Sequence, residues 1–133
     1  HDSCNPARAM GLLDEPRYVL DHVVDNWFEM PENTIREKTF CCGAGTALNT
    51  SEIMELRMRS GFPRANAVKY VHDKHDVNTL ACVCAIDRAT LTVLMDYWIP
   101  DVKVCGVSEL VGNALVIDGE KRQEMDEGLR TMV

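Results

Sequence analysis

The sequence lacks the features that assign many chains to a common class. It has no apolar run of about 18 residues or more, so no segment is expected to span a membrane as a helix. We find no basic and apolar leader, no internal repeat, no P-loop, no Rossmann fingerprint and no Ser-His-Asp arrangement. Basic residues are in the minority, with 14 Lys and Arg against 21 Asp and Glu, and the net charge of −7 argues against nucleic-acid binding.

What remains is the composition of one acidic globular domain. A chain of 133 residues buries roughly two-thirds of its unfolded surface on folding, so it does not need disulfides for stability. The chain begins at His1 without an initiator Met, and we expect it to be a piece of a longer protein.

Cysteine is the unusual component. The six cysteines are Cys4, Cys41, Cys42, Cys82, Cys84 and Cys105. Their uneven spacing matches neither the paired CxxC knuckles of a zinc ribbon nor the run of a ferredoxin. Adjacent cysteines such as Cys41 and Cys42 do not readily bond to each other, because a disulfide needs a favourable separation of the Cα atoms. Ligands for a metal or cluster are therefore favoured over a disulfide framework.

Apolar periodicity predicts alternating strands and helices. We expect strands at 1–4, 38–42, 79–83 and 102–105, and helices at 16–27, 52–59, 64–75, 87–98 and 108–116. Asn49 with Glu52 is a capping signature for the second helix, Gly61 is expected to stop it, and Pro63 to open the third. Such alternation predicts an α/β fold with a small, mainly parallel sheet and flanking helices.

This fold class gathers the cysteines. The C-terminal ends of the predicted strands carry Cys4, Cys41, Cys42, Cys84 and Cys105. Ligands of open α/β sheets bind at that edge, beside helix N-termini. Cys82 precedes Cys84 by two residues on the same strand and is expected to point to the same face.

The chemistry of a thiol-rich edge favours a multi-iron cluster. Thiolates select zinc, copper(I) or iron–sulfur clusters, and zinc usually closes with four ligands, fewer than the thiols available here. Gly43 and Gly45 follow the cysteine pair and would let the backbone approach the group closely. The alternative for any one cysteine is a place in the core, and Cys82 is the most open to it.

Three segments carry a family resemblance. HDSCNPAR, TFCCGAG and CVCAID are similar to the cysteine-rich CCG domain of heterodisulfide reductase catalytic subunits. Within that family they resemble the C-terminal part of the K subunit (DsrK) of the sulfite-reductase-linked DsrMKJOP membrane complex. The resemblance covers residues 1–117 and leaves 118–133 as a charged tail. Its last element departs from the family pattern, because Asp87 or Ala85 stands where the second cysteine of a CxxC is expected.

The resemblance implies a noncubane [4Fe-4S] cluster at which a disulfide or trisulfide is reductively cleaved. The implied ligands are Cys4, Cys41, Cys42, Cys84 and Cys105, with Cys82 and Asp87 in reserve, Cys41 and Cys42 in the catalytic position, and Gly43 and Gly45 at the cofactor. The implied partners are the sulfur carrier DsrC, as a protein disulfide substrate, and other subunits of a membrane-bound redox complex. The chain would then be cytoplasmic, peripheral to the membrane, and without contact to nucleic acid.

Two other functions remain open from the residues. A structural domain could hold zinc with four of the cysteines and serve only subunit contacts. An iron–sulfur subunit of a hydroxyacid oxidase could relay electrons without handling a disulfide. A stretch rich in basic residues is expected to form a solvated helix face or to dock an anionic partner; its members are Arg57, Arg59, Arg64, Lys69 and Lys74.

Overall fold

The structure is a computed structural model that describes residues 1–45 and 50–115. Two parallel strands, β1 (Thr79–Cys82) and β2 (Lys103–Gly106), are joined by the helix α3 (Ala85–Trp98). Parallel neighbours need such a crossover, and the helix supplies it. Within the described residues these are the only strands, and they confirm the predicted α/β class with a small parallel sheet and flanking helices.

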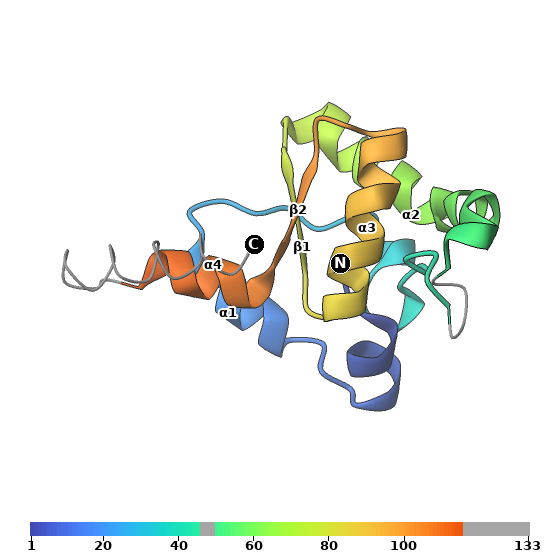
Figure 1. The fold of residues 1–133 in the computed structure, drawn as a ribbon. Coiled ribbons are helices and arrows are strands. Elements are labelled where there is room, and N and C mark those ends of the chain that lie inside the picture. The colour runs from blue at the N-terminus through green and yellow to red at the C-terminus, as the bar shows by residue number, and fades with distance from the viewer. Residues whose placement is uncertain (46–49, 116–133) are drawn as a thin grey trace, which may run out of the picture.

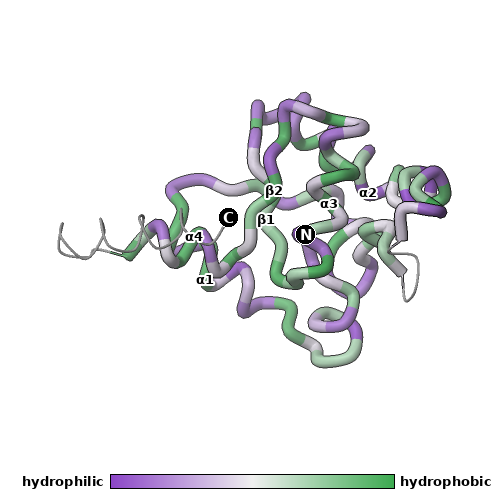
Figure 2. Tube along the Cα trace, viewed as in Figure 1, coloured by the Kyte–Doolittle hydropathy of each residue, from purple (hydrophilic) through white to green (hydrophobic). Residues whose placement is uncertain are grey.

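The core lies where α3 meets the sheet. Leu91, Leu94 and Met95 recur at helical spacing on one face of α3 and have no solvent exposure. They pack in one cluster with Leu80 and Cys82 of β1. Figure 2 shows the hydrophobic stretch along β1 that these contacts cover.

The long helix α2 (Met54–His75) corrects one prediction. The sequence predicts a break at Gly61, but the helix continues through Gly61 and Pro63 as far as His75. Its C-cap residue, Asp76, has a φ of 56°. Gly61 provides close packing: a Cβ there would lie 2.7 Å from Leu94 Cδ1. Packing against α3 thus outweighs the missing N–H of Pro63.

The strands predicted at 1–4 and 38–42 are also wrong. A π-helix, η1, spans Asn5–Ala9, and a 3-10 helix, η3, spans Arg36–Lys38. Side chains satisfy the polar groups that a strand would pair: Thr39 Oγ1 donates to the Asp2 carbonyl at 2.6 Å, and Arg8 donates to the Thr39 carbonyl at 2.7 Å. The two segments lie together without forming a ladder.

Helices lie on both sides of the strands. Figure 1 shows α2 and α3 on one side, and α1 (Glu15–Val23) with α4 (Val107–Ala114) on the other. The described residues also form two more 3-10 turns, η2 (Glu32–Thr34) and η4 (Ser51–Ile53). The predicted cap at Asn49, residues 116–117 and the tail 118–133 lie outside the described residues. No helix in the described part is long and apolar enough to cross a membrane.

Candidate metal centre

The CCG segment forms a tight turn against α2. Cys41 is exposed and Cys42 is buried. Gly43 has φ 89°, and a Cβ there would lie 2.8 Å from the Arg57 carbonyl oxygen of α2. The Gly43 amide donates to Cys41 Sγ at 3.3 Å, and Gly45 also has a positive φ. The two glycines that the sequence places after the cysteine pair are thus required by the backbone of the turn.

Cys42 faces a buried carboxylate. Asp87, in the first turn of α3, is 4% exposed, and its Oδ2 lacks a hydrogen-bond partner among the described residues. His1 Nε2 lies 3.5 Å from that oxygen. Burial, followed by hydrogen bonding to Asp87, raises the pKa of the Cys42 thiol to about 12. Asp87, which the sequence marks only as a reserve ligand, is therefore buried beside Cys42.

The sheet separates two other cysteines. Ala81 pairs with Cys105, and Cys82 with Gly106. Directly paired residues share a face and neighbours along a strand alternate, so Cys82 and Cys105 point to opposite faces. Cys82 joins the core cluster that contains Cys42, whereas Cys105 is half-buried on the other face. The structure thus brings Cys82, rather than Cys105, to the side of the sheet that holds Cys42.

Ser3, the residue before Cys4, contacts the backbone of Cys84. The Cys84 amide donates to Ser3 Oγ at 3.1 Å, across 81 positions of the chain. Cys84 is the N-cap residue of α3, and Cys4 is the N-cap residue of η1. Cys4 is exposed and Cys84 is half-buried. One hydrogen bond therefore places two of the predicted ligands in neighbouring backbone positions.

The residues fit an iron–sulfur cluster by their donor chemistry. In residues 1–45 and 50–115 no three His, Cys, Asp or Glu side chains form a group that could hold one metal ion. A cluster of several irons does not require three ligands at one point, because separate thiolates hold separate irons. The unpartnered Asp87 oxygen and the close backbone approach at Gly43 are the features that suit such a group.

Burial favours the protonated form of the Cys82 and Cys105 thiols. It is the main cause that raises the pKa of Cys82 to about 12, and it also raises the pKa of Cys105. Since metals bind the thiolate, binding at these positions must displace a proton.

Arg64 is a site residue that sequence reasoning misplaced. Rather than lying on a solvated face, it is fully buried and donates to the Thr34 carbonyl at 2.5 Å and to Thr39 Oγ1 at 2.9 Å. The missed signal is a stripe at helical spacing through Gly61, Arg64 and Val68. The stripe becomes visible only when α2 is taken as continuous through Pro63.

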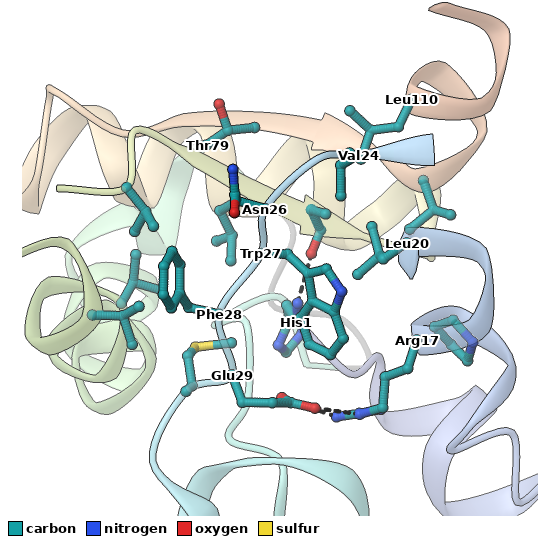
Figure 3. A pocket seen from close by; sticks show the side chains of 18 of the residues that line it. His1, Arg17, Leu20, Val24, Asn26, Trp27, Phe28, Glu29, Thr79 and Leu110 are labelled. Carbon is teal, nitrogen blue, oxygen red and sulfur yellow. Dashed lines mark hydrogen bonds and ion pairs between the residues drawn. The ribbon is translucent and has the colours of Figure 1, made fainter. Parts of the chain in front are cut away.

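A cavity of about 610 Å³ lies beside the N-terminal segment and the outer edge of β1. Figure 3 shows Trp27 and Phe28 in its wall, with Leu20 and Val24 nearby. Arg17 closes one side by pairing with Asp2 at 2.8 Å and with Glu29.

Burial acts to raise the pKa of Asp2, but hydrogen bonds from Arg17 and the Arg36 amide outweigh it and hold that pKa below its usual range.

Replacing Arg17 should loosen the segment that carries Cys4. We expect Arg17→Gln to lower the free energy of unfolding by about 2 kcal/mol, because the buried Asp2 loses its charged partner. Urea unfolding followed by circular dichroism measures the change. Arg59→Gln is the control, since the Arg59–Glu55 pair is exposed and should contribute less than about 0.5 kcal/mol. Equal losses would mean that Arg17 does not anchor Asp2.

Proteins of two kinds are similar to this chain. Over 132 residues the chain is 51% identical to the Hdr-like menaquinol oxidoreductase iron-sulfur subunit of Archaeoglobus profundus, and 49% identical to the corresponding subunit 2 of Archaeoglobus fulgidus. It is 30% identical over 118 residues to a subunit of the dihydromethanophenazine:CoB–CoM heterodisulfide reductase of Methanosarcina mazei. The chain is similar to heterodisulfide-reductase-like iron–sulfur subunits.

The similarity spans nearly all of this chain but a small part of each relative. The alignments cover 98% of the chain for the two Archaeoglobus proteins and 89% for the Methanosarcina protein. They cover 24% and 27% of those relatives, so the chain spans about a quarter of their length. No protein-family model and no solved structure matches the chain.

Proposed function

We propose that this chain is the cysteine-rich part of a heterodisulfide-reductase-like iron–sulfur subunit, where it holds a cluster that reduces a sulfur–sulfur bond. The observation that carries the proposal is the buried Cys42 beside Asp87 at a glycine turn, with Cys82 in the same core cluster, in a chain similar to subunits named for iron–sulfur clusters. We assign the ligands to Cys4, Cys41, Cys42 and Cys84, with the fifth position open to Cys82, Cys105 or Asp87.

The finer proposal concerns the cluster, the substrate and the partners. We assign a noncubane [4Fe-4S] cluster, a protein disulfide or trisulfide of the DsrC type as substrate, and a place in dissimilatory sulfur metabolism. Other subunits of a membrane-bound complex would hold the protein at the cytoplasmic side of the membrane. The relatives support a subunit role, because their names describe them as subunits of oxidoreductases or reductases.

The reaction needs two electrons and two protons to convert one disulfide into two thiols. When bound by the assigned cysteines, an iron–sulfur cluster would supply these electrons one at a time. Cys41, the exposed member of the pair, lies where a substrate can approach. Cys42 and Asp87 are both buried, and are therefore shielded from water. The chain's own contribution is therefore a site open on one side and shielded from water on the other.

The test is metal and sulfide analysis of the full-length subunit purified without oxygen. We expect the residues of this chain to bind about four irons and four sulfides, with an EPR signal of the oxidised form that differs from that of an ordinary cubane. One zinc without iron would contradict the proposal and favour a structural domain. Iron without thiol release from a disulfide substrate would favour an electron relay.

A further inference from the structure

Arg64 is a buried cation without a paired anion. Its guanidinium is 0% exposed, and its Nε has no hydrogen-bond partner in the described part of the chain. Its partners are neutral: the Thr34 carbonyl, Thr39 Oγ1 and, at 2.7 Å, Met30 Sδ. The Phe40 ring centroid lies 5.6 Å from Cζ.

This environment differs from that of four other arginines in the described ranges, and Arg57, about two turns earlier on α2, shares with Arg64 burial and an unpartnered Nε. Arg17, Arg36, Arg59 and Arg88 each form an ion pair with a carboxylate, whereas Arg64 forms none there. Asp2 and Asp87 act on it only from a distance, and burial prevails, lowering its pKa to about 10. A charge removed from water without a paired counterion carries a large free-energy cost, which an anion bound nearby would offset.

The place for that anion is the CCG turn. Gly61, three residues before Arg64 on the same face of α2, packs against the Cys42 carbonyl, 3.2 Å from the position of a Cβ. Arg64 also binds Thr39, two residues before Cys41, and Thr39 in turn binds the Asp2 carbonyl two residues before Cys4. Arg64 is thus linked, through Thr39 and the neighbouring Gly61, to the backbone segments that carry Cys4, Cys41 and Cys42.

We propose that Arg64 is a positioning residue whose buried positive charge balances an anionic, thiolate-held cluster beside Cys42 and raises its reduction potential. The inference rests on the proposed function. Thiolates and sulfides give such clusters net negative charge, and each added electron increases it. A nearby fixed cation therefore stabilises the reduced form more than the oxidised form.

The experiment is a redox titration of the full-length subunit, purified without oxygen and followed by EPR. Arg64→Met removes the charge and approximately keeps the volume, Arg64→Gln removes the charge but keeps an amide donor, and Arg64→Lys keeps the charge. The control, Arg59→Met, removes an exposed charge from the same helix. Iron content and circular dichroism of each variant establish loading and folding.

We expect Arg64→Met and Arg64→Gln to disfavour the reduced form about tenfold, which for a one-electron couple lowers the potential by about 59 mV. Arg64→Lys and Arg59→Met should stay near wild type. Loss of iron from folded Met and Gln variants, with iron kept in the Lys variant, would also support the charge role. Unchanged potentials in iron-loaded Met or Gln variants, or equal iron loss in all three Arg64 variants, would overturn it. A wild-type protein without iron would overturn the proposed function itself.

Discussion

Replacing Cys42 with serine is expected to remove nearly all iron from the protein while leaving it folded. Cys42 is the buried member of the pair, held by the glycine turn and beside Asp87. Serine keeps the shape of the side chain but provides a hydroxyl, a poor ligand for iron compared with a thiolate. Iron and sulfide analysis of the full-length subunit purified without oxygen measures the loss, and circular dichroism verifies the fold.

The matched comparison is between Cys82→Ser and Cys105→Ser. Cys82 lies on the face of the sheet that holds Cys42, and Cys105 lies on the opposite face. We therefore expect Cys82→Ser to lose more iron than Cys105→Ser, which reverses the order favoured by the sequence. Full iron retention in Cys42→Ser would refute the assigned site, and a larger loss in Cys105→Ser would refute the assignment by sheet face.

Gly43→Ala should destabilise the protein by about 3 kcal/mol. A left-handed conformation costs a non-glycine residue about 1–2 kcal/mol, and overpacking adds a similar amount. Here φ is 89°, and the new Cβ would meet the Arg57 carbonyl at 2.8 Å, so the turn or α2 must move. Urea unfolding measures the loss, and the displaced cysteines should also bind less iron.

Gly11→Ala separates the two causes. Gly11 has φ 68°, but nothing lies within 4 Å of the position of its Cβ. It should therefore show only the conformational cost of about 1 kcal/mol and keep its iron. Similar losses in the two variants would mean that contact with α2 adds nothing to the requirement for Gly43.

Some of the site followed from local pattern. Leu91, Leu94 and Met95 recur at helical spacing between two short apolar runs, and this sufficed to predict the β1–α3–β2 unit. Cys84, directly after one of those runs, is the N-cap of α3, near the strand end predicted for it. The glycines after Cys42 also have the positive φ angles that their type permits.

Predictions failed where long-range contacts decide the backbone. The sequence predicts strands at 1–4 and 38–42, but the side chains of Arg8 and Thr39 bind backbone polar groups of these segments instead. Pro63 signals a helix start locally, yet packing of Gly61 against Leu94 carries α2 through it. None of these partners is near in sequence, so no local pattern reveals them.

Local sequence was enough to predict the chemistry available here: six thiols, a glycine turn after two of them, and a parallel α/β unit to carry them. Side-chain type and apolar spacing are local properties, and they suffice for that. Three features of the site depend on the folded chain: Cys82 and Cys105 lie on opposite faces, Asp87 adjoins Cys42, and Arg64 is buried. Strand register and helix packing set these relations, because both depend on contacts between residues far apart in the chain.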